Sequence, residues 1–467
     1  MPTILAVDRA AAIAWYRRNR VRSERIFDLV DPSAYYTRPI ALRNPIVFYE
    51  GHLPAFSVIA FLRRGLGKPP VDRRLEDLFA RGIDPDSVDA AVPRSGAQTR
   101  WPSRDDVRAF ARACDEAILG ALREDLLPVE GLYTALEHEA MHQETLLYMW
   151  HRLPFDQKRR PSGEGRGANG EGRGATGEER GASRGNAARL GAAESVVVPA
   201  GTATLGAERA HTVFGWDNEF EAHRVDVGAF EIDILPVANA QFLDFVNAGG
   251  YETRELWDDE GWAWIRADHV EHPAFWLSGD APRSSPLASR GWQWRGMFEA
   301  IPLPLDWPVY VSQAEANAYA RWKGRRVMTE AEFHRAAFGD GGSTSGGDHG
   351  STRLDSEGAA WTAPPGHYDF AGFDPVPVGS FPESAGPWGA HDLIGNGWEW
   401  TSTVFGPFPG FRPMASYPEY SAEFFDGRHY VMKGASPATA KELVRPSFRN
   451  WFRGNYPYVY AKFRTVA

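Results

Sequence analysis

The stretch Leu136–Thr145, with the sequence LEHEAMHQET, decides how the first third of this 467-residue chain folds. Apolar residues recur around it at helical spacing and no proline interrupts Glu130 to Leu153, so the sequence predicts one long helix. Its two histidines, His138 and His142, are four residues apart and share one helix face, with Cβ atoms about 5–6 Å apart. Two such imidazoles can bind one transition-metal ion. The alternative is a core helix whose histidines bind nothing.

Helix-like segments occupy the whole region before residue 155. Ser103, followed by two acidic residues, is typical of a helix N-cap. Four segments of this kind favour a four-helix bundle over residues 1–155. The segments are Ala10–Leu29, Phe56–Leu66, Ser103–Leu126 and Glu130–Arg152.

The remainder of the chain predicts a flexible linker and a second domain. Residues 156–193 are rich in Gly, Arg and Glu, and nearly lack apolar side chains, which is typical of a flexible spacer. Residues 194–467 alternate short β-like runs with Gly, Pro and Trp, so we expect a large, loop-rich domain and an α+β multidomain protein. Its expected helices are Asn239–Asn247, Ser312–Lys323 and one that begins at Thr329 with a capping box closed by Glu332.

Composition excludes several classes of protein. The formal net charge is −10, and no basic patch indicates nucleic-acid binding. Cys114 is the only cysteine, which excludes an internal disulfide and a thiolate metal cluster. The sequence shows neither an apolar signal segment nor a run of 18 apolar residues, so we expect a cytoplasmic protein with no membrane partner.

The best third ligand for a metal is His52, at the head of a helical segment in the same domain. Three imidazoles on one face of an ion leave positions open for substrate and dioxygen, as in non-haem Fe(II) oxygenases. Those enzymes usually have one carboxylate ligand, so an all-histidine set is a departure. Glu144 follows His142 by two residues and points about 200° around the helix, which indicates a supporting role.

A zinc hydrolase is the rival interpretation. His138 to His142 also match the H-E-x-x-H pattern, with Glu139 as the general base. Such hydrolases usually take a third ligand from the segment that follows. Here Pro154 and the glycine-rich tract follow, and neither supplies one.

A second group of candidate residues lies near the C-terminus. The run from Arg445 to Arg453 contains Trp451, whose ring face attracts quaternary ammonium groups. Asn450 offers a donor and an acceptor, and Arg449 and Arg453 can pair with carboxylates. The segment therefore suits a betaine-type amino acid, unless its aromatic residues only pack in the core.

Together these motifs resemble the iron-dependent sulfoxide synthases of ergothioneine biosynthesis. In that family a DinB-like four-helix bundle precedes a formylglycine-generating-enzyme-like domain of C-type-lectin-like fold. The resemblance covers nearly the whole chain apart from the glycine-rich tract, and its strength is the order of the motifs. The matching segments are Gly51–Phe56, His138–Glu144, Phe214–Glu219, Pro236–Asn239, Arg326–Phe333, Gly395–Thr401 and Arg449–Trp451.

The resemblance implies a reaction and a cofactor. Family members use Fe(II) and O₂ to join a thiol sulfur to the imidazole C2 of hercynine (Nα-trimethylhistidine) as a sulfoxide. It implies that His52, His138 and His142 bind the iron, and that Asn450 and Trp451 bind hercynine. Carboxylate recognition by Arg449 and Arg453 is a further expectation. The partners would be small molecules: hercynine, O₂, and cysteine or γ-glutamylcysteine.

Departures from the family pattern bear on the sulfur donor and the catalytic tyrosine. Members that use γ-glutamylcysteine carry Asp where this chain has Phe452. They also carry a tyrosine shortly after the Trp-Glu-Trp-Thr motif, where this chain reads Val404-Phe405. Both changes resemble the subgroup that uses cysteine and takes its tyrosine from the N-terminal domain. The candidates there are Tyr35, Tyr36 and Tyr133.

Three other interpretations of the site are compatible with the sequence. Met141 stands where some members have Gln near the substrate imidazole, so a related C–S or C–Se bond-forming enzyme acting on another histidine derivative is one alternative. A binding module that has lost its chemistry is the second, and the zinc hydrolase is the third. A true formylglycine-generating enzyme is disfavoured because it needs two cysteines for copper.

Overall fold

The computed structural model describes residues 7–80, 100–124, 127–161, 194–279, 291–339 and 362–467, and it divides into two compact units. The helical unit comprises Met1–Pro161 together with Pro413–Tyr420. The second unit comprises Ser162–Arg412 and Ser421–Ala467. Most of the expected flexible linker, from residue 162 onward, lies outside the described residues.

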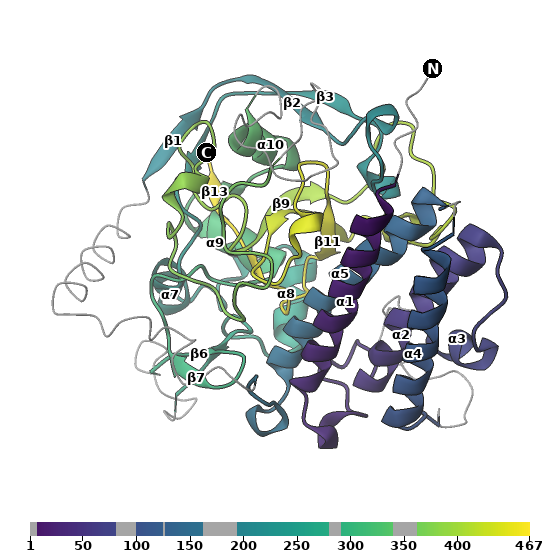
Figure 1. Cartoon of the computed structure of the whole chain (residues 1–467). Coiled ribbons are helices and arrows are strands. Elements are labelled where there is room, and N and C mark those ends of the chain that lie inside the picture. The colour runs from purple at the N-terminus through teal and green to yellow at the C-terminus, as the bar shows by residue number, and fades with distance from the viewer. Residues whose placement is uncertain (1–6, 81–99, 125–126, 162–193, 280–290, 340–361) are drawn as a thin grey trace. The chain divides into compact units, whose positions relative to one another are not determined.

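The helical unit is built from helices that pack side by side (Figure 1). Helix α2 packs against α4 and α5, and α1 packs against α5. The chain after α5 stays attached to this unit, because Lys158 is buried and forms a β-bridge with Val30. The helices are α1 (Arg9–Asp28), α2 (Ile46–Ser57), the π-helix η2 (Val58–Gly65), α3 (Arg73–Phe79), α4 (Arg104–Ala121) and α5 (Val129–Arg152).

Capping side chains explain where several of these helices begin. Asp8 accepts a hydrogen bond from the Ala11 amide at the start of α1. Ser103 does the same for Asp106 at the start of α4, as the sequence predicted. Each cap satisfies one of the backbone N–H groups that have no partner within the helix.

Helix α2 differs from the sequence-based expectation. It begins at Ile46, so His52 lies in the middle of the helix and not at the head of a segment. All 12 of its residues are buried. The stretch Ile46–Gly65 is long and apolar enough to cross a membrane. However, 89% of its apolar stretch is buried inside the structure. That burial is typical of a core helix.

The second unit combines short strands with four α-helices among its described residues. Three of the helices were predicted from the sequence: α7 (Asn239–Asn247), α9 (Gln313–Trp322) and α10 (Glu330–Phe338). The fourth is α8 (Asp259–Ala267). The strands are β1 (Ser195–Val198), β2 (Gly201–Leu205), β3 (His223–Val227), β4 (Phe230–Asp233), β5 (Trp276–Leu277), β6 (Gln293–Arg295), β7 (Ala300–Pro302), β8 (Arg326–Val327), β9 (Gly397–Val404), β10 (His429–Ala435), β11 (Asn450–Arg453), β12 (Ala461–Lys462) and β13 (Thr465–Val466).

The described strands form two four-stranded sheets and two smaller ones. One sheet has the order β1-β4-β13-β8 and the other β11-β10-β9-β12. Strands β2 and β3 pair with each other, and β5, β6 and β7 form the fourth sheet. In the second large sheet β11 pairs antiparallel with β10, with Trp451 opposite Val431. This pairing places Asn450 and Trp451 on an ordered strand.

Buried ion pairs connect distant segments of the second unit. Arg449 donates to both carboxylate oxygens of Glu330, at 3.0 and 3.1 Å. Glu399 lies within 3.0 Å of the Lys462 ammonium and 2.7 Å of the Arg464 guanidinium. All five side chains are buried. Because a buried charge is stabilised only by a partner, these pairs fix which segments meet.

The Phe214–Glu219 motif is a second connecting point in this unit. Asn218 donates a 2.9 Å hydrogen bond to Ser421, which itself donates to Asp217. Glu219 accepts hydrogen bonds from Arg445 and Ser447. The motif therefore holds the residue that follows Tyr420 and the segment that precedes β11.

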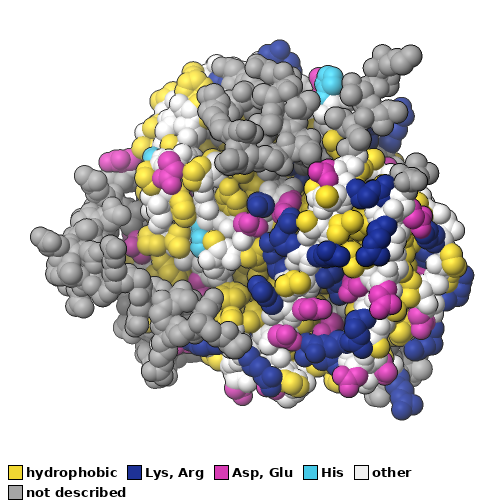
Figure 2. All heavy atoms as spheres, viewed as in Figure 1, with side chains coloured by type: hydrophobic (Ala, Val, Ile, Leu, Met, Phe, Trp, Pro, Cys, Tyr) yellow, Lys and Arg dark blue, Asp and Glu magenta, His cyan; other side chains and the backbone are white. Residues whose placement is uncertain are grey.

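The surface carries charges of both signs. Figure 2 shows Lys and Arg side chains next to Asp and Glu side chains on the face in view. Mixed charge of this kind agrees with the modest net charge of −10.

Candidate metal centre

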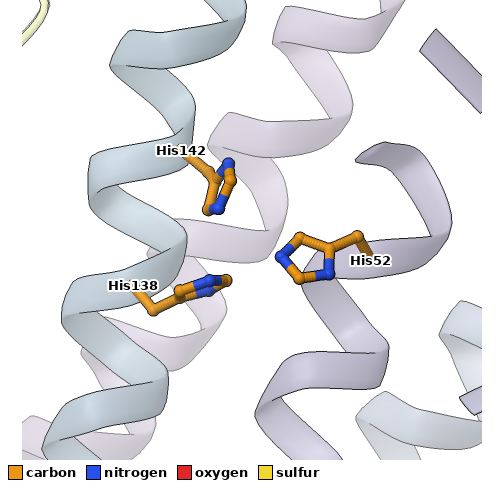
Figure 3. A group of neighbouring side chains, drawn as sticks. All are labelled: His52, His138 and His142. Atoms are coloured by element: carbon orange, nitrogen blue, oxygen red, sulfur yellow. The ribbon is translucent and has the colours of Figure 1, made fainter. Parts of the chain in front are cut away.

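Three imidazoles of the helical unit point toward one another (Figure 3). His138 and His142 extend from adjacent turns of α5, and His52 extends from α2. One ligand nitrogen from each lies within 4.8 Å of the others. The ring centroids are 4.4 Å apart for His138 and His142 and 5.0 Å apart for each pairing with His52. The structure therefore brings together the three histidines that the sequence singled out.

The orientation of His52 is set by α3. Its Nδ1 lies 2.7 Å from the carbonyl oxygen of Phe79, which can only accept, so Nδ1 carries the proton and Nε2 keeps its lone pair. Gly51 permits this contact. A Cβ there would lie 2.4 Å from the Phe79 ring, so any larger residue would displace the group that orients His52.

The other side of His52 and one face of His138 are packed by aromatic rings. Phe48 stacks on His52 at 5.1 Å, and Phe56 stacks on His138 at 3.5 Å. These contacts restrict rotation of both imidazoles. A rigid, apolar surround of this kind holds ligand geometry and excludes water.

The nitrogens of the three histidines fit a metal ion. Among the described residues, no hydrogen-bond partner contacts His52 Nε2, His142 Nδ1 or either ring nitrogen of His138. Buried polar atoms are normally hydrogen-bonded, and one left without a partner costs about 1–3 kcal/mol. Several such atoms converging at one point are the donor set that a metal ion would satisfy.

Burial also keeps these imidazoles in the form that binds metals. It lowers the pKa of His52 to about 4, against the opposing effect of the Phe79 hydrogen bond. Burial likewise lowers the pKa of His138 and His142 well below 6.5, and the neighbouring imidazoles lower it further. All three rings are therefore neutral near pH 7, and a neutral imidazole is a metal ligand.

Glu139 belongs to a different face of α5. Its Oε1 accepts hydrogen bonds from Arg20 at 2.8 Å and from Ser23 at 2.6 Å, both on α1. Gln143 lies on the same face and donates to Ser23 at 3.0 Å. The carboxylate that a zinc hydrolase would use as general base is thus engaged in helix packing, which argues against that rival.

Comparison with known proteins shows the family. Residues 182–467 match the model of the sulfatase-modifying factor enzyme 1-like domain. A hercynine oxygenase of Mycolicibacterium thermoresistibile is 33% identical over 423 residues, which is 88% of this chain and 84% of the relative. The chain belongs to the hercynine oxygenase family. The resemblance inferred from the sequence motifs is confirmed.

Two other relatives match over part of their length. The hercynine oxygenase of Mycobacterium tuberculosis is 38% identical over 54% of this chain and 55% of that protein. The ergothioneine biosynthesis protein 1 of Neurospora crassa is 26% identical over 92% of this chain and 54% of that protein. Each of these two matches spans about half of the relative.

Sequence reasoning missed three tyrosines near this site. The buried ring of Tyr49, on α2, lies 5.9 Å from His142. The other two are Tyr417 and Tyr420. Both come from the Pro413–Tyr420 segment of the helical unit. The ring of Tyr417 lies 6.1 Å from His138 and 4.9 Å from Phe56. The Tyr420 hydroxyl donates to the sulfur of Met141 at 3.4 Å. The sequence does place Tyr417 and Tyr420 downstream of the Trp-Glu-Trp-Thr motif, which could have identified them. They lie further from the motif than the family pattern led us to expect.

The tyrosines predicted from the N-terminal domain have other surroundings. Tyr36 is 53% exposed, and its hydroxyl donates to the Pro102 carbonyl at 3.2 Å. Tyr35 is buried beside it, under the Arg104 guanidinium. Tyr133 packs against Trp15 at 6.0 Å. Of these tyrosines and Tyr417, it is Tyr417 whose ring lies against His138.

The C-terminal candidates lie in the second unit. Asn450 and Trp451 are half-buried, and Trp451 stacks on Phe405 with centroids 4.2 Å apart. Arg453 is also half-buried and ends the same strand. Arg449 differs from the expectation, because its guanidinium is buried and pairs with Glu330. Its charge is therefore already paired inside the fold, next to the start of β11.

Proposed function

We propose that this protein is an Fe(II)- and O₂-dependent sulfoxide synthase that joins the imidazole C2 of hercynine to the sulfur of cysteine. In the overall reaction O₂ accepts four electrons: the C2–H and S–H bonds break, C–S and S–O bonds form, and the second oxygen atom leaves as water. The observation that carries the proposal is the convergence of three imidazoles with unpartnered nitrogens in a member of the hercynine oxygenase family.

The metal would be held by His52 Nε2 and by one nitrogen each of His138 and His142. Three neutral donors on one side of an ion suit Fe(II), and a bound Fe(II) would activate dioxygen at its open positions. The chain's own contribution is positioning. Phe56 and Phe48 fix two of the rings, and the apolar surround limits water at the reacting atoms.

Tyr417 is our proposal for the proton donor of the site, in place of Tyr36 and Tyr133. Its ring contacts both His138 and Phe56. General acid catalysis typically contributes about 10²–10⁴-fold to a rate. We expect Tyr417→Phe to lower kcat by about 100-fold while iron content stays at the wild-type level. Tyr36→Phe is the matched control and should retain full activity.

For hercynine binding we propose Asn450 and Trp451, with Arg453 as a further contact. The face of Trp451 offers the quadrupole that attracts a trimethylammonium group. The Asn450 amide can donate to a carboxylate, although its oxygen already accepts from the Trp451 amide at 2.9 Å. Trp451→Ala should therefore raise KM for hercynine more than it lowers kcat.

The sulfur donor proposed is cysteine, because Phe452 replaces the acidic residue of members that use γ-glutamylcysteine. The test is to load anaerobically purified protein with Fe(II), add hercynine, then add air with either donor. Mass spectrometry should show a hercynyl sulfoxide with cysteine and much less with γ-glutamylcysteine. No product from either donor contradicts the proposal.

One alternative chemistry is tested by the same assay. Met141, and not an amide, receives the Tyr420 hydrogen bond beside the histidines. If hercynine gives no product, a panel of other histidine derivatives with thiol and selenol donors would reveal a related C–S or C–Se bond-forming enzyme.

A further inference from the structure

The segment Pro413–Tyr420, which we call the clasp, belongs to the helical unit although the residues on both sides belong to the second unit. It carries Tyr417, whose ring lies beside His138, and Tyr420, whose hydroxyl donates to Met141. A short segment so far from the helices in sequence has no regular hydrogen bonding of its own to hold it there. Its position must come from specific contacts.

Ser416 provides those contacts with all three of its polar groups. Its amide donates to Glu130 Oε1 at 2.7 Å. Its hydroxyl lies 2.8 Å from the hydroxyl of Thr134. Its carbonyl accepts from Arg64 Nη1 at 2.8 Å. Ser416 is 4% exposed and Thr134 is fully buried, so water does not compete for these bonds.

The anchoring residues stand in register with the metal ligands. Glu130, Thr134, His138 and His142 follow one another at intervals of four along α5, and residues at this spacing lie on one face of a helix. Ser416 is bound at the first two positions, and the ring of the next residue, Tyr417, reaches the third. One face of α5 therefore positions His138 and His142 and also the Tyr417 ring.

We propose that Thr134 and Ser416 are positioning residues that hold Tyr417 against the metal site through the Thr134–Ser416 hydroxyl pair. The inference rests on the proposed function, since it assigns these residues a role in that reaction. Removing the Thr134 hydroxyl leaves the buried Ser416 hydroxyl without its partner. The clasp then has one hydrogen bond fewer to α5. Displacing a reacting group by about 1 Å can lower a rate by about 100-fold.

The test compares three threonine variants of the full-length, Fe(II)-loaded protein. Thr134→Val removes the hydroxyl and keeps the shape, and Thr134→Ser restores a hydroxyl. Thr145→Val is the control, because the Thr145 hydroxyl on the same helix only bonds the Met141 carbonyl, at 3.3 Å. The readouts are kcat, KM for hercynine, iron content, melting temperature and hydrogen exchange of the Ser416 amide.

The expected result separates positioning from general stability. Thr134→Val should lower kcat by about tenfold, less than the full displacement effect, with KM and iron content close to wild type. The unpartnered Ser416 hydroxyl should lower the melting temperature only slightly. The Ser416 amide of this variant should exchange faster. Thr134→Ser should recover most of the activity, and Thr145→Val should match wild type in every readout.

Two results would overturn the inference. One is a Thr134→Val enzyme that is indistinguishable from Thr145→Val in kcat and in Ser416 exchange. The other is a Thr134→Ser enzyme as slow as Thr134→Val, which would show that shape matters and the hydroxyl does not. A wild-type protein without sulfoxide synthase activity would instead contradict the proposed function, and the exchange measurement would still report whether Thr134 holds the clasp.

Discussion

Two sets of buried polar groups, one in each unit, are satisfied in opposite ways. In the second unit the buried carboxylates Glu219, Glu330 and Glu399 each contact a buried arginine. In the helical unit the three clustered histidines have nitrogens without a hydrogen-bond partner among the described residues. In both cases, burying the polar groups costs desolvation free energy. The two cases differ in whether the chain itself supplies the partner.

This difference separates groups that specify the fold from groups that bind something else. Each paired carboxylate joins segments far apart in sequence, as Glu330 joins α10 to β11 through Arg449. Removing one partner should therefore damage folding. Neither ring nitrogen of His138 is hydrogen-bonded to another segment among the described residues, so removing this histidine should damage metal binding and leave the fold intact. The predictions below test this division, from the largest expected effect to the smallest.

Replacing a metal ligand should abolish function without unfolding the protein. His138→Ala removes one of three donors, so we expect loss of stoichiometric iron and loss of measurable sulfoxide formation. The melting temperature of the metal-free protein should not fall, because the wild-type imidazole has unpartnered nitrogens there. Metal analysis and calorimetry give both readouts. The exposed His211 is the control position, and His211→Ala should keep its iron.

Removing a paired carboxylate should have the opposite outcome. Glu330→Ala leaves the buried Arg449 guanidinium unpaired, and we expect the second unit to lose about 3–5 kcal/mol of stability. Urea unfolding measures this loss. Glu221→Ala removes a carboxylate from a half-exposed pair with Arg209 and should cost less than about 1 kcal/mol. Equal losses of stability in Glu330→Ala and Glu221→Ala would contradict the proposed role of the buried ion pair.

Disturbing the support of a ligand should give an intermediate effect. In Gly51→Ala the new Cβ would overlap the Phe79 ring, so the carbonyl that orients His52 must move. Loss of such support typically costs 10–100-fold in metal affinity, and we expect about tenfold here. Competition with a chelator measures it. Gly120→Ala in α4 meets no atom within 4 Å and should leave affinity unchanged.

Acidification should weaken the metal-free helical unit. The pKa of His52 is about 4 in the fold and 6.5 is its ordinary value, so between these pH values the unfolded chain takes up a proton that the folded chain refuses. Stability should fall as pH is lowered through that window, by up to about 1.4 kcal/mol per pH unit for one histidine. Unfolding experiments on the metal-free protein test this. A His52→Asn variant should show a shallower slope, and an unchanged slope would contradict the assignment.

Local patterns in the sequence predicted much of the fold and the three ligands. Caps and amphipathic periodicity located α1, α4, α5 and α10, and the i, i+4 spacing placed His138 and His142 on one face. The start of α2 was missed for a physical reason. Because every face of this helix is buried, it carries no polar stripe from which a period could be read.

Contacts between distant segments were beyond local patterns. No periodicity indicates that Tyr417 lies against His138, or that Glu139 turns to Arg20 while its neighbour faces the metal site. Arg449 illustrates the same limit. From the sequence alone, the Arg449 guanidinium could pair with a ligand carboxylate or with a carboxylate of the protein. Only the fold shows that its partner is Glu330.

The clasp has a consequence for how the protein matures. Its hydroxyl contact joins residues 282 positions apart, whereas all three histidines lie in the first part of the chain to be synthesised. At roughly 5–20 residues per second, the ribosome delivers Ser416 on the order of 15–60 s after Thr134. A nascent chain can therefore bring the three histidines together well before the clasp and its tyrosine are synthesised.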